Sequence, residues 1–458
     1  MKVPWSDDEW QRVLVYGMGK SGLAATRLLR ARDVAVVAVD ARHDVALGDL
    51  ESDPMIELRL GAETIPLPPG IDGMVLSPGV PVSSPLVREA ERRSLPVIAE
   101  VELAFPFLDG TVVAITGSNG KSTTATLTAA MLEESGVDAV LCGNIGEPLA
   151  AQVDGPPGRS FVVELSSFQL ETVRTFRADA AALLNVTPDH MDRYPDFAAY
   201  AAAKARIFER QDERSVAVLN ADDPETVAIG AGVASARRRW FSLRRPVEDG
   251  CYLDSGAVVE ASAGRAAELF AVAEVAMVGS HNVENAMAAS LLALAAGGDR
   301  ASLRRVVGRF DGLPHRTRRI RERRGVAWYD DSKGTNVGAT LKSLEGFPDR
   351  SVHLILGGVG KGQDFAPLRE AVARKAKAVY LIGAAAREIE LALAGAATAK
   401  RSATLERAVA EANAAASGGD VVLLSPACAS FDQFTDFTHR GRRFQELVGA
   451  LDDGERDG

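Results

Sequence analysis

The 458-residue sequence is poor in cysteine and histidine, with three and six residues, and its aromatic content is 6%. The cysteines, Cys142, Cys251 and Cys428, lack the paired spacing of a zinc site or a disulfide framework, which indicates a reducing compartment. The chain opens without a basic and apolar leader, and no run reaches the ~18 apolar residues of a membrane span. We therefore expect a cytoplasmic protein that does not insert into membranes.

Positive charge is also scarce, since the formal net charge is −10. Binding to a nucleic-acid backbone needs clustered Lys and Arg, so this balance argues against a nucleic-acid partner. One arginine-rich run lies between Arg316 and Arg324, and we interpret most of it as a solvated loop or the edge of a sheet. A phosphorylated ligand would have to meet a local positive site.

Short apolar runs alternate with longer helical patterns, which is typical of α/β domains with parallel sheets covered by helices on both faces. At roughly 150 residues per domain, the length suggests about three domains. Turn-rich segments place the expected boundaries at 1–107, 108–312 and 313–458. The expected strands are 13–16, 34–39, 112–116, 161–165, 180–186, 216–220, 326–329, 352–356, 379–382 and 421–424.

The first candidate site is the glycine turn Gly17-Met-Gly-Lys-Ser-Gly22, which follows an expected strand and opens a helix. Asp40 ends the next strand, where a ribose-binding acid is expected in a dinucleotide fold, and Ser77-Pro-Gly79 ends another strand of the same sheet. A helix N-terminus binds a diphosphate whichever nucleoside carries it, so the motif does not select NAD. A tight structural turn without a ligand is the alternative.

The second candidate site is the phosphate loop Thr116-Gly-Ser-Asn-Gly-Lys-Ser-Thr123, which also lies between an expected strand and a helix. Its backbone NH groups would hold phosphates, Lys121 would neutralise them, and Ser122 or Thr123 would ligate Mg²⁺. The strict pattern fails at Ile115, which stands where the first glycine should be. Further polar residues, Asn144, Glu164 and His190, follow neighbouring strands, and the carboxylate suits Mg²⁺ best.

Several separated motifs together resemble the Mur ligases over nearly the whole chain. They are 117–123 (GSNGKST), 143–146 (GNIG), 164–171 (ELSSFQLE), 185–195 (NVTPDHMDRYP), 279–282 (GSHN), 313–316 (LPHR), 331–336 (DSKGTN) and 425–430 (SPACAS). The resemblance implies three domains, which bind a UDP-linked substrate, ATP and an incoming amino acid in that order. It implies ATP and Mg²⁺ as cofactors, and UDP-N-acetylmuramoyl-L-alanine and D-glutamate as substrates, in peptidoglycan synthesis.

The same resemblance assigns site residues. The substrate carboxylate would attack the γ-phosphate of ATP, and the amine of the amino acid would displace the resulting acyl phosphate. Lys121, Lys333, Arg316 and two Mg²⁺ ions would reduce the repulsion between the two anions. The UDP end would contact Gly17, Gly19, Lys20, Ser21, Asp40, Arg42 and Gly79. The ATP site would comprise Gly117, Ser118, Asn119, Gly120, Lys121, Ser122, Thr123, Asn282, Asn285, Arg316 and Asp331.

Lys204 aligns with a lysine that these enzymes carry as a carbamate, an anionic metal ligand. From the sequence alone it would be a surface lysine of a helix. The resemblance implies that Lys204 and His190 hold one magnesium ion, while Glu164 and Ser122 or Thr123 hold the other. It places Asn144 in the catalytic machinery as well.

Four residues, Thr335, Lys361, Ser430 and Phe437, would surround D-glutamate by the same resemblance. From the sequence alone, Lys361 has an ordinary surface role as its alternative, and Asn282 and Asn285 have helix capping. The chain departs from the family pattern at Ser118, Ala41 and Phe431.

The rival hypotheses are a ligase for another acceptor and a nucleotide-binding oxidoreductase or regulatory module. The Asp-Asn-Pro-Arg loop of a diamino-acid ligase is missing from the sequence, and the phosphate loop argues against the oxidoreductase. We expect a monomer.

Overall fold

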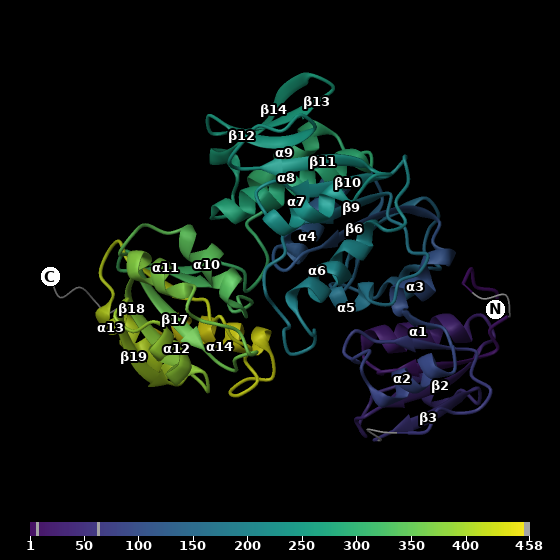
Figure 1. Ribbon diagram of the computed structural model, residues 1–458. Coiled ribbons are helices and arrows are strands. Elements are labelled where there is room, and N and C mark those ends of the chain that lie inside the picture. The colour runs from purple at the N-terminus through teal and green to yellow at the C-terminus, as the bar shows by residue number, and fades with distance from the viewer. Residues whose placement is uncertain (6–8, 62–64, 453–458) are drawn as a thin grey trace. The chain divides into compact units, whose positions relative to one another are not determined.

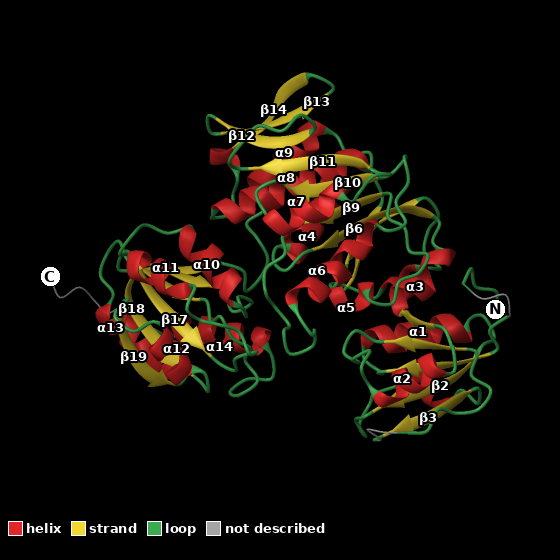
Figure 2. Cartoon of the chain, in the orientation of Figure 1, coloured by secondary structure: helices red, strands yellow, loops and turns green. Residues whose placement is uncertain are grey.

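The structure is a computed structural model that describes residues 1–5, 9–61 and 65–452. It contains three sheets flanked by helices, which confirms the expected α/β class and three-domain plan (Figures 1 and 2). The chain forms two compact units. One comprises Met1–Val186, Ala198–Phe270 and Ala286–Val306, and the other comprises Thr187–Phe197, Ala271–Asn285 and the chain from Val307 onward. In the ranges described, no helix is both long and apolar enough to cross a membrane.

The N-terminal sheet has five parallel strands in the order β3-β2-β1-β4-β5. The order reverses between β1 and β4, and in open α/β sheets ligands bind at such a switch point, outside the carboxyl ends of the strands. The glycine turn follows β1 at this point. The elements are β1 (Arg12–Tyr16), α1 (Lys20–Arg30), β2 (Ala35–Asp40), β3 (Ile56–Leu60), β4 (Gly73–Leu76), α2 (Pro85–Arg92), β5 (Val97–Ala99) and α3 (Glu100–Ala104).

The central sheet has nine strands in the order β14-β13-β12-β11-β10-β9-β6-β8-β7. Neighbouring strands pair in parallel along the part of the sheet that runs β7-β8-β6-β9-β10-β11-β12, and β13 then runs antiparallel to β12. The strands are β6 (Gly110–Thr116), β7 (Ala139–Gly143), β8 (Arg159–Glu164), β9 (Ala180–Leu183), β10 (Val216–Asn220), β11 (Arg237–Ser242), β12 (Gly250–Asp254), β13 (Ala257–Ser262) and β14 (Arg265–Ala271). The helices are α4 (Lys121–Glu134), α5 (Ser167–Leu170), α6 (Phe197–Ala205), α7 (Pro224–Ala231), α8 (Ser280–Ala295) and α9 (Arg300–Arg309).

The C-terminal sheet has the order β15-β16-β20-β17-β18-β19, and all of its pairs are parallel except β15 with β16. Much of the arginine-rich run forms β15 at the edge of the sheet. This agrees with one of the two interpretations of that run, the edge of a sheet, and not with a solvated loop. The strands are β15 (Arg318–Arg323), β16 (Val326–Asp330), β17 (Val352–Gly357), β18 (Ala376–Ile382), β19 (Thr398–Ala403) and β20 (Val421–Leu424). The helices are α10 (Val337–Glu345), α11 (Leu368–Lys375), α12 (Ala386–Ala392), α13 (Leu405–Ala415) and α14 (Phe437–Gly449).

Both faces of the C-terminal sheet are buried, which explains why its strands are apolar throughout. Along β17, Leu354 and Leu356 pack in one core cluster with residues of α10, α11 and α12, while Ile355 packs in another with residues of α13 and α14. Figure 2 shows these helices around the sheet. The carboxyl ends of β16, β20 and β17, which are neighbours in the sheet, therefore emerge together from a rigid support.

Candidate functional site

The phosphate loop connects β6 to α4 at the carboxyl edge of the central sheet. Gly117 has φ +154° and Gly120 has φ +87°, in the left-handed region that favours glycine. Gly120 is the N-cap of α4, so the first free NH groups of this helix face the loop. The loop thus has the strand, glycine turn and helix arrangement expected from its sequence.

Asn185, which follows β9, clamps the phosphate loop. Its side-chain oxygen accepts from the NH of Asn119 at 2.9 Å, its side-chain amide donates to the carbonyl of Asn119 at 3.1 Å, and its own carbonyl accepts from the NH of Ser118 at 2.9 Å. The Ser118 hydroxyl also lies 3.0 Å from the Tyr200 hydroxyl. The site assignment from sequence missed Asn185 and Tyr200, although both lie within or close to quoted motifs.

Two lysines converge on one carbonyl of the loop. Lys121 Nζ donates to the carbonyls of Gly117 and Ser118 at 2.8 and 3.1 Å, and Lys204 Nζ donates to that of Gly117 at 2.9 Å. Lys204 is 1% exposed and its ammonium lies 4.6 Å from the centre of the Tyr200 ring. The surface role expected from sequence alone for Lys204 is therefore wrong, because α6 turns this residue toward the phosphate loop.

Glu164 ends β8, next to β6 in the sheet. Its carboxylate is 2% exposed, and one oxygen accepts from the side-chain amide of Asn144 at 2.7 Å. The other oxygen, Oε2, is buried and has no hydrogen-bond partner among the described residues. A buried, unpaired carboxylate oxygen is costly unless something else binds it. This oxygen at a strand end beside the phosphate loop fits a divalent cation.

The glycine turn after β1 opens into a cavity of about 460 Å³. Gly17 has φ +90°, and a Cβ on Gly22 would lie 1.9 Å from the carbonyl oxygen of Gly17, so glycine is required for α1 to approach the turn. The Ser77 hydroxyl donates to the same carbonyl at 2.5 Å. All seven residues expected at the UDP end line this cavity: Gly17, Gly19, Lys20, Ser21, Asp40, Arg42 and Gly79.

Asp40 is held from several sides. Its oxygens accept from the NH of Met18 at 2.7 Å, from the NH of Arg42 at 2.9 Å and from the Arg42 guanidinium at 2.9 and 3.0 Å. The hydrogen bonds from Arg42 lower the pKa of Asp40 to about 2, so it stays ionised. Asp40 therefore orients Arg42 and braces the glycine turn.

Arg440 of α14 joins two strand-end loops of the C-terminal sheet. Its guanidinium donates to the hydroxyl and carbonyl of Ser332 at 3.0 and 2.8 Å, and to the carbonyl of Cys428 at 3.2 Å. Burial lowers its pKa to about 10, so it stays charged at neutral pH although it is 1% exposed. Next to it, Lys333 Nζ lies 3.9 Å from the centre of the Phe437 ring. The structure thus brings Lys333 and Phe437 together. Sequence reasoning missed Arg440, which holds the loops that carry Ser332 and Cys428.

Asp331 lies at the start of the loop after β16, and its buried carboxylate accepts hydrogen bonds from two hydroxyl groups. Its Oδ2 accepts from Ser343 and from Ser425, each at 2.7 Å, and its Oδ1 accepts from the NH of Thr317 at 3.1 Å. Burial raises the pKa of Asp331 to about 6. Ser425 begins the loop that carries Ser430, which is 2% exposed.

In the compact unit that holds the C-terminal sheet, a cavity of about 440 Å³ has both His190 and Lys361 in its wall. Asp189 lies between them, since its oxygens lie 3.5 Å from Lys361 Nζ and 3.7 Å from His190 Nε2. The side-chain amide of Asn336 also donates to Asp189, at 3.0 Å. His190 has φ +57°. Lys361 is 21% exposed at its side chain, so it is not an ordinary surface lysine.

Two further expected nucleotide contacts, Asn282 and Asn285, lie on α8. The side-chain amide of Asn285 donates to the side-chain oxygen of Asn282 at 3.1 Å, and that of Asn282 donates to the carbonyl of Val278 at 2.7 Å. The helix begins at Ser280, so neither residue is its N-cap. Arg316, also expected at the nucleotide, is half-buried near β15. Thr335, expected at D-glutamate, is half-buried in the loop after β16.

The fold and these loops define a three-domain α/β protein of the phosphate-loop class. Residues 11–99 match the Mur ligase MurD-like N-terminal domain, 115–293 the Mur ligase middle domain and 315–428 the Mur ligase glutamate ligase domain. The chain therefore belongs to the Mur ligase family, and within it to the UDP-N-acetylmuramoylalanine–D-glutamate ligases, as two full-length relatives show.

The first of these relatives, the UDP-N-acetylmuramoylalanine–D-glutamate ligase of Koribacter versatilis, is 42% identical over 98% of this chain and 100% of its own. The enzyme of that name from Myxococcus xanthus is 45% identical over 96% of this chain and 98% of its own. A solved structure, the MurF ligase of Thermotoga maritima in complex with ADP, aligns over 96% of this chain and 95% of its own. Its TM-score is 0.59 at 18% identity, so this likeness concerns the fold alone.

Proposed function

We propose that the protein is an ATP-dependent, ADP-forming ligase that joins D-glutamate to UDP-N-acetylmuramoyl-L-alanine in peptidoglycan precursor synthesis. The names of its full-length relatives support the reaction. The geometric observation that carries it is the buried Glu164 oxygen without a partner, at the strand next to a phosphate loop with two lysines. A site of this charge pattern suits the phosphorylation of one anion by another.

In the reaction, a carboxylate oxygen of the UDP-linked substrate bonds to the γ-phosphorus, and the bond from that phosphorus to the ADP oxygen breaks. The amine of D-glutamate then attacks the carbonyl carbon, and phosphate leaves with the carboxylate oxygen. Lys121 and the loop NH groups would hold the phosphates, with Gly117, Ser118, Asn119 and Gly120 supplying the loop. Asn282, Asn285, Arg316 and Asp331 would contact the rest of the nucleotide.

Magnesium would be held by Glu164 together with the hydroxyl of Ser122 or Thr123, and it would supply charge neutralisation at the phosphates. Within the described ranges, no three His, Cys, Asp or Glu side chains form a metal cluster. A second ion would rest on His190 and a carbamate of Lys204. The burial of Lys204 and its direction toward Gly117 support that role.

The uridine diphosphate would occupy the cavity at the glycine turn, where the exposed Lys20 and the oriented Arg42 supply positive charge. D-Glutamate would bind near the strand ends of the C-terminal sheet. There Lys361 supplies a cation, while Thr335, Ser430 and Phe437 form the wall, and Lys333 neutralises the developing charge. Asn144 would act through the Glu164 carboxylate that it orients.

We place the protein in the cytoplasm as a monomer, without a nucleic-acid partner. The support for this location is the state of Cys142, Cys251 and Cys428, which are all buried free thiols. The net charge of −10 supports the absence of a nucleic-acid partner.

Phosphate release from ATP tests the function directly. With UDP-N-acetylmuramoyl-L-alanine and Mg²⁺ present, we expect release with D-glutamate and little with L-glutamate, L-alanine or lysine. Release with another amino acid but not with D-glutamate would reassign the acceptor. An enzyme that leaves ATP intact under all of these conditions would contradict the ligase assignment and favour a nucleotide-binding module.

Oxygen labelling tests the acyl phosphate. If the substrate carboxylate carries ¹⁸O, one labelled oxygen should appear in the released phosphate, because the bond formed at phosphorus survives the attack of the amine. Unlabelled phosphate would show that water, and not the carboxylate, attacked ATP.

A further inference from the structure

Two residues at the centre of the phosphate loop, Ser118 and Asn119, lie between two glycines with positive φ. The φ angles are +154° at Gly117 and +87° at Gly120. Glycine takes either sign of φ with little cost, so the backbone can pivot at both ends of the Ser118–Asn119 pair. The loop therefore keeps one shape only if groups outside it hold this pair in place.

Asn185 supplies three hydrogen bonds to this pair. Its own carbonyl accepts from the NH of Ser118 at 2.9 Å, and its side-chain amide bonds to both the NH and the carbonyl of Asn119, at 2.9 and 3.1 Å. The peptide units on either side of Asn119 therefore cannot rotate without breaking a hydrogen bond. The loop also packs closely here, since a Cβ on Gly117 would lie 3.1 Å from Cβ of Leu184.

The hydrogen bonds from Lys121 to the same loop cannot replace this restraint. Lys121 Nζ donates to the carbonyls of Gly117 and Ser118, but the same ammonium group has to turn to the phosphates when it neutralises a nucleotide. The amide of Asn185 is neutral and has no such second task, so its bonds persist when ATP binds. Because Asn185 accepts from the NH groups of Ser118 and Asn119, the phosphates would meet the NH groups from Gly120 onward, which open α4.

The residues on both sides of Asn185 are held in turn by the end of β10. The side-chain amide of Asn220 donates to the carbonyl of Leu184 at 2.9 Å, and the carboxylate of Asp223 accepts from the NH of Val186 at 3.3 Å. Asn220 is 5% exposed, so the first of these bonds is shielded from water. Asn185 thus projects toward the phosphate loop from a fixed backbone.

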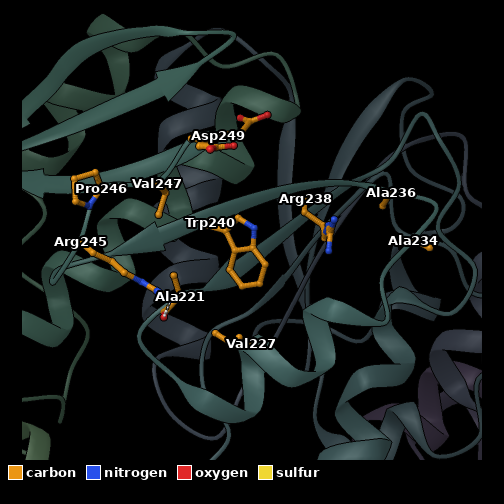
Figure 3. Close-up of a pocket in the computed structure, with 11 residues that line it drawn as sticks. Ala221, Val227, Ala234, Ala236, Arg238, Trp240, Arg245, Pro246, Val247 and Asp249 are labelled. Carbon is orange, nitrogen blue, oxygen red and sulfur yellow. Dashed lines mark hydrogen bonds between the residues drawn. The ribbon is translucent and has the colours of Figure 1, made fainter.

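The far side of this support borders a cavity of about 560 Å³, shown in Figure 3. Ala221, which follows β10, lines the cavity and donates its NH to the carbonyl of Phe241 on β11 at 2.9 Å. Among the described residues, no side chain that bonds to the phosphate loop lines this cavity. A substitution of Asn185 therefore leaves the cavity wall unchanged.

We propose that Asn185 is a positioning residue for phosphoryl transfer. It fixes Ser118 and Asn119, so that Lys121 and the NH groups at the start of α4 meet the phosphates of ATP in one arrangement. Donors that are already fixed need no reorganisation when charge develops on the phosphates. The proposal rests on the function proposed above, because it assumes that the loop binds ATP. Asn185 acts through the loop and not by contact with the reacting atoms.

Calorimetric titration of ADP with Mg²⁺ into the full-length protein, together with steady-state rates, tests this role. Asn185→Ala removes both side-chain bonds to Asn119, so it should weaken ADP binding and raise KM for ATP by at least about tenfold, with a lower kcat. KM for D-glutamate and for the UDP-linked substrate should change less than about threefold. A merely structural loss would reduce the amount of active enzyme and lower the rate without raising KM for ATP.

Gln211→Ala is the matched control. Gln211 is 6% exposed, and its side-chain amide donates to the carbonyls of Ala178 and Val216 at 3.1 Å each. These carbonyls lie at the amino ends of β9 and β10, whereas the phosphate loop lies at the carboxyl edge of the sheet. The control thus removes an amide that makes two bonds to the backbone near the same strands, away from the nucleotide. Its ADP affinity and its KM for ATP should stay within about twofold of those of the unsubstituted protein.

A second variant covers the case in which Asn185→Ala does not fold. Asn185→Ser keeps a short polar side chain at this half-buried position but cannot bridge the NH and the carbonyl of Asn119, so it should weaken ADP binding in the same way. The proposal alone is overturned if the Asn185 variants bind ADP within twofold of the unsubstituted protein, or if Gln211→Ala loses as much affinity as they do. An unsubstituted protein that binds no ADP would overturn the ATP site of the proposed function as well.

Discussion

The substitution Glu100→Gln tests how a buried carboxylate sets the pH dependence of stability. Glu100 begins α3 and is 1% exposed. Its Oε1 accepts from the NH of Ala150 at 2.5 Å, while Oε2 is buried without a partner among the described residues. Burial raises the pKa of Glu100 from 4.5 to about 7.

The sign follows from proton linkage. Between pH 4.5 and about 7 the unfolded chain has released a proton that the folded protein still holds at Glu100, so stability falls as pH rises through this window. A pKa difference of this size corresponds to about 3 kcal/mol above pH 7. Glutamine is neutral at every pH, and its side-chain oxygen can still accept from Ala150. Glu100→Gln should therefore stabilise the protein at pH 8 by up to about 3 kcal/mol, and by less than about 1 kcal/mol at pH 5.

Glu102, on the same helix and equally buried, provides the control. Its oxygens accept from the NH groups of Arg174, Thr175 and Phe176 and from the Thr175 hydroxyl, at 2.6 to 2.9 Å. An amide NH₂ in place of either oxygen would leave two of these donors without an acceptor. Glu102→Gln should thus destabilise the protein by about 2 kcal/mol or more at both pH values.

Urea unfolding followed by tryptophan fluorescence at pH 5 and pH 8 measures both variants. The same chemical change should give opposite signs at pH 8, because the Glu100 carboxylate has one donor and the Glu102 carboxylate has four. If the difference in unfolding free energy between Glu100→Gln and the unsubstituted protein is the same at the two pH values, the argument from burial is refuted.

The other predictions concern the ligase site. Lys121→Ala should lower kcat at least about a hundredfold through lost charge neutralisation, and near-normal phosphate release would show that the phosphate loop has been misinterpreted. Glu164→Gln should raise the Mg²⁺ concentration needed for half-maximal rate by about tenfold or more, measured by metal titration at saturating ATP, and an unchanged requirement would remove Glu164 from the metal site. Arg440→Lys keeps the charge but loses the planar guanidinium group that bridges Ser332 and Cys428. We expect kcat to fall at least about tenfold and the free energy of unfolding to fall by about 2 kcal/mol. A normal rate would exclude Arg440 as a positioning residue.

Strand and helix prediction from the sequence succeeded where a segment is buried on both faces. The strand 421–424 was predicted with its observed bounds, and so was 216–220, because apolar residues fill both sides of these parallel strands. Prediction failed for β11 to β14, which extend the central sheet. Their strands carry many polar and charged residues, among them Arg237 to Arg239, and so lack the continuous apolar signal.

The sequence by itself determined the α/β class, the two glycine turns between strand and helix, and the family, because glycine turns and contiguous motifs carry local geometry and chemistry along the chain. Only the tertiary structure decided what those motifs meet. It buried Lys204 against the phosphate loop, left one oxygen of Glu164 unpaired, and used Arg440 and Asn185 to brace loops distant in sequence. Burial and hydrogen-bond partners depend on which strands become neighbours, and strand order is a property of the whole sheet that no single segment encodes.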